Sequence, residues 1–341
     1  MPDSKYRGLS DQQISAIKRD EKMMELLRDP KLFLGIRNGY FNLYFQGAST
    51  GKCSILDTGG LKIKTHCKYL GTGGNGYQTI SQGDFPSRLD KILSSIQNHQ
   101  KSGKGWEEKK VQQALLMANN RNADSVWYCV DMEYTQQRQS SDEPCYGRFD
   151  IVALSRIPDA KKGQHQVALI ELKVNSGSYN SKLPKEIQRQ IEDGTFSIDR
   201  CEVGLGSGII GHLADFYRFE RAGHFSQLRE EICQILSTKH KLGFSVPCAG
   251  IRPDKIATQP FFYFLTLCTN ISSCKATMCR YLGADGYTRL ATYNAKRVLG
   301  STFLDRENYR FLFAPQKFYE ASPVNILEDS CVEELCYRTE T

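Results

Sequence analysis

Two short apolar runs, each with charged residues at one end, constrain the fold of this chain more than any other feature. Residues 151–154 follow Asp150 directly, and residues 167–173 include Glu171 and Lys173. Such runs are typical of buried strands. Side chains alternate between the two faces of a strand, so Glu171 and Lys173 point the same way. Because buried ions are costly unless they pair or bind a metal, these residues indicate a functional site.

Two carboxylates beside a lysine are the residues that metal-assisted cleavage of a phosphodiester requires. Carboxylate oxygens bind a divalent cation, while a lysine positions or activates water and offsets the charge that develops on the phosphate. The alternative is an ordinary ion pair at the end of a sheet. We favour the metal site because both carboxylates stand on predicted strands that are spaced as in a hairpin.

Asp150 followed by Glu171-Leu172-Lys173 resembles the signature of the PD-(D/E)xK, or restriction-endonuclease-like, nuclease superfamily over residues 105–220. Phe149 stands where the signature is named for proline, a position at which proline is commonly absent in the family. The resemblance implies an α/β fold with a mixed central sheet flanked by helices. It also implies a magnesium- or manganese-dependent nuclease, with DNA favoured over RNA. Asp150 and Glu171 would then bind the metal, and Lys173 would orient the attacking water.

The resemblance further implies an acidic residue on the helix that precedes the two strands. A helix predicted near residues 105–120 offers Glu107 and Glu108. Family helices often have glutamate four residues before glutamine. Glu108 stands four residues before Gln112, which favours Glu108 as the third metal ligand. Acidic residues are also favoured at a helix N-terminus by its dipole, so both glutamates have a purely structural explanation as well.

Five other polar residues are weaker candidates for the same site. Glu133 ends the strand before Asp150 and is either a further ligand or an exposed acid. Gln188 and Gln190 follow the lysine on a predicted helix, where related nucleases often carry a supporting glutamine. His212 and Asp215 follow a glycine-rich turn at a helix start, where backbone N–H groups can meet phosphate. A structural role is the alternative for each of them.

The composition is that of an ordinary soluble globular protein. The 341 residues are enough for two ordinary domains or one large one, and 40% hydrophobic and 24% charged residues are typical values. The net charge of +7 fits a nucleic-acid partner without requiring one.

The sequence gives no sign of zinc binding, secretion or a membrane span. The twelve cysteines include no CxxC pair, and Cys274 and Cys279 have no histidines nearby. The first residues lack an apolar signal core, and the longest apolar run, residues 260–268, is too short to cross a bilayer. We therefore expect a cytoplasmic protein with reduced thiols and no membrane partner.

The remaining patterns predict an α/β protein in three parts. Residues 1–100 form a helix over 9–28 and then a β-rich region, residues 101–225 form the nuclease core, and residues 226–341 form an α/β extension that is either separate or continuous with the core. Strands are expected over residues 33–36, 40–45, 53–56 and 61–64, with Asn38-Gly39 as a hairpin turn. Residues 71–76 match GxGxxG by letter, but no helical pattern follows, so a loop is expected.

Three functional alternatives remain open. The first is a nuclease fold kept for binding nucleic acid or protein without catalysis. The second is a defence-complex subunit whose nuclease needs a partner, and a homo-oligomer is equally open. The third and weakest is nucleotide binding through the glycine-rich turns.

Overall fold

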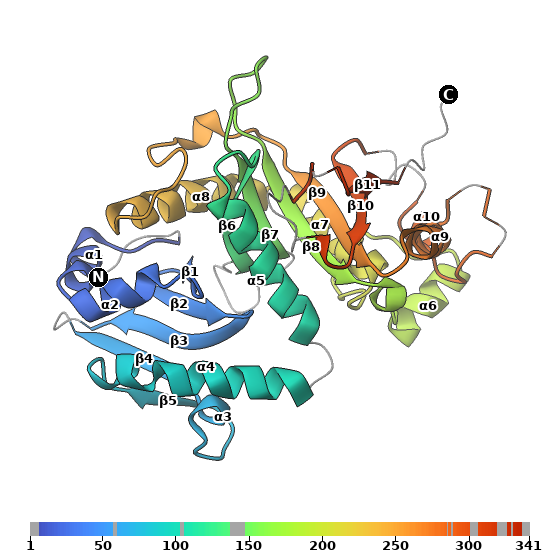
Figure 1. Ribbon diagram of the computed structural model, residues 1–341. Helices are drawn as coiled ribbons and strands as arrows, with labels where there is room; N and C mark the ends of the chain where they lie inside the picture. Colours follow the sequence, from blue (N-terminus) through green and yellow to red (C-terminus); the bar gives the residue numbers. More distant parts are fainter. Residues whose placement is uncertain are drawn as a thin grey trace. The chain divides into compact units, whose positions relative to one another are not determined.

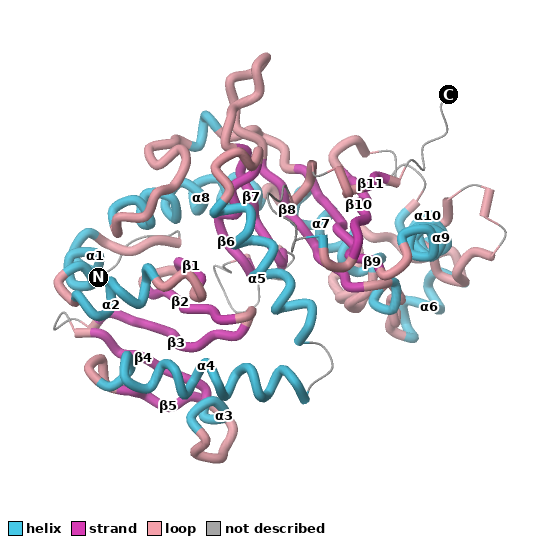
Figure 2. The backbone as a smooth tube through the Cα atoms, in the orientation of Figure 1, coloured by secondary structure: helices cyan, strands magenta, loops and turns pink. Residues whose placement is uncertain are grey.

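The computed structural model describes most of the chain (Figures 1 and 2). The described residues are 7–56, 60–102, 106–136, 147–284, 286–287, 289–300, 306–318, 326–328 and 330–335. The chain divides into two compact units, each built from separate stretches of sequence. The first unit comprises Met1–Ala123, Tyr128–Met132 and Gln227–Ile256, and the second comprises Asp124–Trp127, Glu133–Ser226 and Ala257–Thr341. The predicted three-part division stays a prediction.

The first unit contains an antiparallel sheet of five strands in the order β1-β2-β3-β4-β5. The strands are β1 (Phe33–Ile36), β2 (Tyr40–Phe45), β3 (Ala48–Ile55), β4 (Leu61–His66) and β5 (Tyr77–Ile80). The strands predicted from alternation are thus present, and Asn38 and Gly39 form the turn between the first two. The loop before β5 contains the glycine-rich residues 71–76, as expected.

Helix α4 (Asp84–Ser102) packs on one face of this sheet. A Cβ atom at Gly51 on β3 would lie 3.1 Å from the Phe85 ring of α4 and 3.2 Å from Ile63 on β4. The alternating residues on that face include the fully buried Phe41 and Cys53. The hydrophobic periodicity of two therefore assigns one face of the sheet to the core.

The other helices of the first unit include one correction. The helix predicted over residues 9–28 is wrong, because the chain forms two helices there, α1 (Asp11–Lys18) and α2 (Glu21–Arg28). The Asp20 side chain accepts the N–H of Met23 at 3.0 Å and so starts a new helix. The remaining helices of this unit are α3 (Cys67–Leu70), α5 (Trp106–Arg121) and α8 (His224–Lys241), and a short 3₁₀ turn spans Pro253–Lys255.

A buried ionic cluster holds distant segments of the first unit together. Asp131 is 1% exposed and accepts from Arg7 Nη1 at 2.9 Å and from Arg37 Nη1 at 2.8 Å. Arg7 Nε also lies 3.3 Å from Glu231 Oε2 on α8. Lys239, about two turns further along α8, donates to the Val130 carbonyl at 2.7 Å. Burial lowers the pKa of Lys239 to about 8, although Asp131 opposes this shift.

A mixed sheet in the order β11-β10-β9-β8-β7-β6 supplies the strands of the second unit, although Tyr128–Met132 of β6 belong to the first unit. The strands are β6 (Trp127–Thr135), β7 (Arg148–Ser155), β8 (Val167–Val174), β9 (Phe261–Cys268), β10 (Tyr309–Pro315) and β11 (Glu333–Glu334). β7 and β8 are antiparallel, whereas β8, β9 and β10 are parallel. The mixed α/β class predicted from the sequence is therefore confirmed.

Four helices and one 3₁₀ turn described in the second unit complete its fold. They are η1 (Ser176–Ser178), α6 (Lys185–Glu192), α7 (Ile209–Arg221), α9 (Ile271–Leu282) and α10 (Ala295–Leu299). The core between α7 and the sheet is aromatic. Phe216 of α7 stacks on Phe262 with ring centroids 4.7 Å apart, and Phe264 stacks on Phe311 at 5.2 Å.

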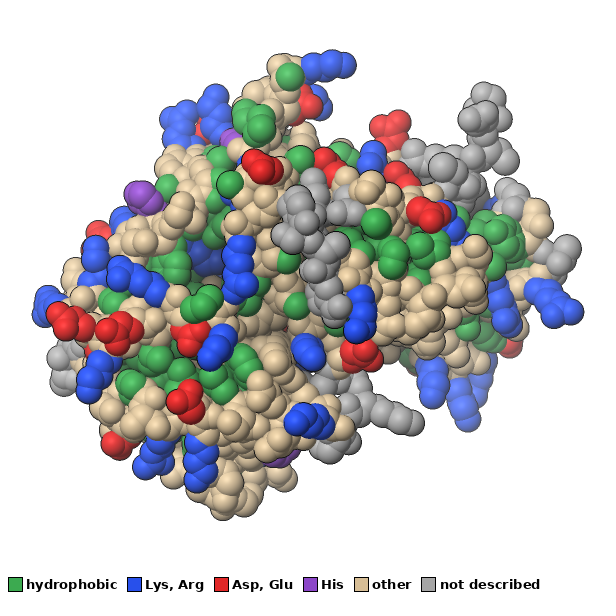
Figure 3. Space-filling view, viewed as in Figure 1, with side chains coloured by type: hydrophobic (Ala, Val, Ile, Leu, Met, Phe, Trp, Pro, Cys, Tyr) green, Lys and Arg blue, Asp and Glu red, His purple; other side chains and the backbone are tan. Residues whose placement is uncertain are grey.

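The described helices include no candidate membrane span, and the face drawn in Figure 3 shows no single basic stripe. No helix in the described residues is both long and apolar enough to cross a bilayer. On the face shown in Figure 3, lysine and arginine side chains are scattered among acidic and apolar ones. The overall charge of +7 therefore does not by itself identify a binding groove.

The ionic cluster gives a first prediction. Asp131→Asn removes the charge that compensates Arg7 and Arg37, so we expect the free energy of unfolding to fall by about 3–5 kcal/mol. Urea unfolding of the full chain would measure this change. Asp90→Asn, on the exposed side of α4, is the matched control and is expected to change stability by less than about 0.5 kcal/mol. Equal effects of the two variants would show that the cluster contributes nothing.

Candidate active site

The open end of the β7–β8 hairpin carries the predicted site residues. The backbone ladder between the two strands ends at the pair Ile151 and Ile170, next to Asp150 and Glu171. There the Leu172 N–H donates to Asp150 Oδ2 at 2.7 Å. The Asp150 carboxylate is thereby held against the middle of the Glu171-Leu172-Lys173 segment, so the structure brings together residues that lie about twenty positions apart in the sequence.

Glu171 is a buried carboxylate with two nitrogen partners. Glu171 is only 4% exposed and Lys173 only 6%. Lys173 Nζ pairs directly with Glu171 Oε1, and His212 Nε2 lies 3.0 Å from the same oxygen. Glu171 and Lys173 lie on the same face of β8, as the alternation of side chains along a strand predicts. The contact with His212 was not predicted.

The end of β8 is anchored to its parallel neighbour β9. Thr266 of β9 is the register partner of Lys173, and its hydroxyl accepts a hydrogen bond of 2.7 Å from the buried Tyr179 OH. The Asn175 side chain accepts from the N–H of Thr269 at 2.9 Å. These bonds tie the chain that follows Lys173 to a central strand, so the charged residues stand on a rigid support.

Helix α7 covers the sheet face that carries Glu171. Phe216 of α7 packs on Phe264, the register partner of Glu171, with centroids 5.1 Å apart. A close crossing fixes the first turn of this helix, since a Cβ atom at Gly211 would lie 1.9 Å from the Gly206 carbonyl oxygen. Only glycine fits there, and His212 is the next residue.

The environment of α7 changes the protonation of two of its side chains. Burial, and after it the positive charge of Lys173, lowers the pKa of His212 to about 3, while a hydrogen bond with the Ser207 backbone opposes the shift. His212 is therefore a neutral imidazole at pH 7. Burial raises the pKa of Asp215 to about 6, against the opposing charges of Arg218 and Arg148. Asp215 is thus close to its titration point at neutral pH.

The structure places the remaining candidates elsewhere or leaves their roles untested. Glu107 and Glu108 lie on α5 in the first unit, whereas Asp150 lies in the second, so their part in a metal site stays a prediction. Glu133 has a left-handed φ of 50° near the end of β6. Gln188 donates to the Leu183 carbonyl at 2.7 Å, at the start of its own helix. The role proposed for Gln190 is likewise untested.

The donor chemistry of the site fits a hard divalent cation. Among the described residues, no group of three or more His, Cys, Asp and Glu side chains gathers to hold a metal. Asp150 and Glu171 are nevertheless two carboxylates at one strand end, and Mg²⁺ keeps several waters and needs only one or two such ligands. These two residues, and no described third one, would hold the ion.

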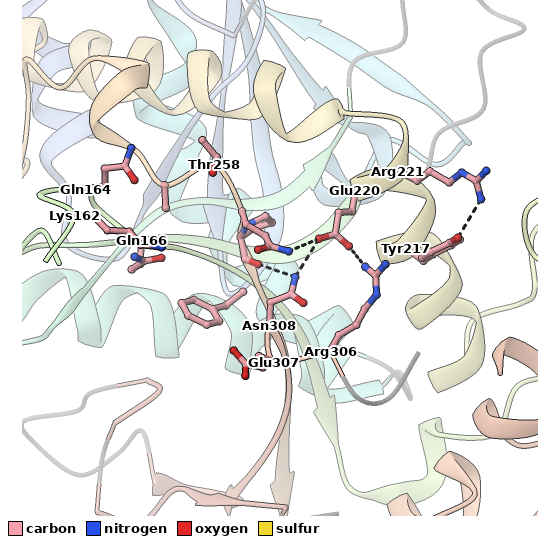
Figure 4. A pocket seen from close by; sticks show the side chains of 14 residues that line it. Lys162, Gln164, Gln166, Tyr217, Glu220, Arg221, Thr258, Arg306, Glu307 and Asn308 are labelled. Carbon is pink, nitrogen blue, oxygen red and sulfur yellow. Dashed lines mark hydrogen bonds and ion pairs between the residues drawn. The ribbon is translucent and has the colours of Figure 1, made fainter. Parts of the chain in front are cut away.

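A separate polar pocket of about 860 Å³ lies at the opposite end of the same strands, where β8, β9 and β10 begin (Figure 4). Its walls include Gln166 just before β8, Phe261 at the start of β9 and Asn308 just before β10. One wall of the pocket is a polar network, in which Glu220 accepts from Gln259 Nε2 at 3.1 Å and pairs with Arg306. The carboxylate there is used for internal contacts, so we assign the reactive groups to the other end of β8.

No family model, curated protein or solved structure matches this chain. The interpretation of the site accordingly depends on its own residues and contacts. The described residues form a mixed α/β protein with an antiparallel five-stranded sheet and a mixed six-stranded sheet.

The close crossing at the start of α7 gives a second prediction. Gly211→Ala forces the backbone of residues 206–211 apart, so we expect a loss of about 1–3 kcal/mol in the free energy of unfolding. Gly177→Ala is the matched control, because no atom lies within 4 Å of its added Cβ. Chemical denaturation would compare the two. A Gly211 variant as stable as the Gly177 variant would contradict the crossing as described.

The raised pKa of Asp215 gives a third prediction. The folded state favours the protonated carboxyl, so this contribution to stability is fully present below about pH 4 and is lost as the pH rises through about 6. Asp215→Asn imitates the protonated form. We therefore expect the difference in the free energy of unfolding, variant minus wild type, to increase by about 1–2 kcal/mol from pH 4.5 to pH 7.5. Urea unfolding at both pH values would measure the difference, and a pH-independent difference would contradict it.

Proposed function

We propose that this protein is a metal-dependent nuclease that hydrolyses phosphodiester bonds in nucleic acid, with DNA favoured over RNA. The observation that carries the proposal is the buried pair of Glu171 and Lys173 with Asp150 held against the same strand segment. A structural ion pair requires one carboxylate and one cation. A divalent cation needs a further carboxylate ligand, and Asp150 provides one at the same strand end.

The geometry supports a division of roles among the residues. Asp150 and Glu171 would hold Mg²⁺ or Mn²⁺, which supplies a Lewis acid for the phosphate and a more acidic bound water. Lys173 would orient the attacking water and stabilise the negative charge that develops on the phosphate. Its ammonium group is compact and stands on a rigid strand, both of which suit a point-charge role.

His212 extends this set as a positioning residue. Its neutral imidazole lies against Glu171 Oε1, and the Gly211 crossing limits where it can move. A neutral imidazole contributes no positive charge that would compete with the metal for Glu171. Removing it would leave the carboxylate less firmly oriented, in the way that groups around metal ligands commonly act.

The order of elements supports the finer fold assignment that we propose. Helix α5 precedes β6, β7 and β8, and β9 then returns parallel to β8 after further helices. A mixed sheet between helices, with the charged residues at the end of the antiparallel pair, resembles the restriction-endonuclease-like core. The cofactor, the nucleic-acid partner and the enzyme class follow from this resemblance and from the site together.

Cleavage assays provide the fourth prediction. We expect purified protein to cut linear, circular or single-stranded DNA, or RNA, with Mg²⁺ or Mn²⁺ and not with EDTA. Asp150→Asn, Glu171→Gln and Lys173→Ala should each lower the rate by at least about a hundredfold, because each removes a group that acts on the reacting phosphate. Glu186→Gln, on the exposed side of α6, is the matched control and should cut like the wild type.

The outcomes separate the proposal from its alternatives. Thermal unfolding of every variant would establish that it is folded before its rate is compared. Equal cleavage by the wild type and the three variants would come from a contaminant and would contradict the proposal. Absence of cleavage with metal still bound, measured by calorimetry, would favour a subunit that needs a partner. Absence of both would favour a binding module.

A further inference from the structure

The first unit has an open sheet face that carries only neutral and basic side chains. Helix α4 covers the opposite face, where its Phe85 ring lies against Gly51 of β3. The strands β1 to β5, as described, contain no aspartate and no glutamate. We call the side opposite α4 the basic sheet face, and it consists of the exposed or half-buried residues Tyr40, Lys52, Ser54, Lys62, Lys64, His66, Tyr77 and Thr79.

Cross-strand pairing places lysines directly against one another on this face. Lys52 of β3 is the register partner of Lys64 of β4, and Lys62 lies two residues before Lys64 on the same strand. Like charges opposite each other in an antiparallel pair are destabilising. A protein keeps such an arrangement at a cost to its own stability, and an anionic partner would relieve it.

Aromatic rings lie beside these lysines. The Lys52 ammonium lies 4.0 Å from the centre of the Tyr40 ring. At the far side of the face Tyr77 is 61% exposed, and it packs edge-on against His66 with centroids 5.2 Å apart. An exposed tyrosine of this kind offers a flat surface for stacking.

We propose that the basic sheet face binds single-stranded nucleic acid, with the lysines contacting phosphates and the rings of Tyr77 and His66 stacking on bases. Basic grooves with aromatic platforms are the general solution for unpaired strands, because every base has a stacking face whatever its sequence. A duplex would meet the lysines but not the rings, since its bases are already stacked. A lipid surface would meet the lysines and the rings but would provide no flat bases for stacking, so the comparison with vesicles below separates the two.

This site does not depend on the proposed nuclease. It lies entirely in the first unit, whereas Asp150, Glu171 and Lys173 lie in the second. Binding can therefore be measured in EDTA, where metal-dependent cleavage cannot occur. Failure of the binding test would leave the nuclease proposal untouched, and failure of the cleavage test would leave this one untouched.

Fluorescence anisotropy with a labelled single-stranded thymidine oligonucleotide tests the proposal on the full chain. We expect Lys62→Glu/Lys64→Glu to weaken binding at least about tenfold. Two lost phosphate contacts would also lower the slope of log affinity against log salt by about 1.4. Tyr77→Ala should weaken binding about tenfold with the salt slope unchanged, because stacking is not electrostatic. Tyr77→Phe should bind like the wild type.

Lys22→Glu/Lys91→Glu is the matched control, since both lysines are exposed in the same unit but lie on α2 and α4. It carries the same change in charge and should have little effect. Equal loss in both double variants would mean that total charge alone acts, which would overturn the proposal. Equal affinity for a duplex of the same length, or tighter binding to phosphatidylserine vesicles, would overturn it as well.

Discussion

Burying a carboxylate costs several kcal/mol unless cations or hydrogen-bond donors surround it, and each of the two compact units contains such a carboxylate. In the first unit Asp131 is enclosed by Arg7 and Arg37. In the second, Glu171 is enclosed by Lys173 and His212. The two solutions differ in kind. Asp131 draws its partners from segments far apart in the sequence and binds them into one core, whereas Glu171 draws one partner from its own strand.

This difference decides how far the sequence alone could lead. Alternation placed Glu171 and Lys173 on one face of a strand, and the hairpin spacing brought Asp150 to them, because both relations are local. The contact of His212 with Glu171 spans 41 positions and depends on the Gly211 crossing, which no periodicity reports. The cluster around Asp131 was missed for the same reason, since three chain segments must meet before its charges compensate one another.

Local competition explains the helix boundary that prediction placed wrongly. Residues 11–28 have a helical pattern throughout, but the Asp20 side chain satisfies the N–H of Met23 and starts a second helix. Aspartate favours helix caps over helix interiors for this reason. The basic sheet face shows the opposite case. Its alternation was read correctly as strand, yet the pairing of Lys52 with Lys64 depends on strand register, which the sequence did not fix.

The charged side chains of the two proposed sites differ in how firmly they are held, and each kind suits its proposed activity. Glu171 stands near the end of the central strand β8, where movement would cost hydrogen bonds to β9, and such rigidity suits chemistry that tolerates little displacement. Lys62 and Lys64 of the basic sheet face are exposed, and long flexible side chains suit contacts to phosphates that vary in position. A strand held by the first unit would gain local concentration near any cleavage site in the same chain. Binding that persists in EDTA, with cleavage that requires metal, would be the joint signature of the two sites.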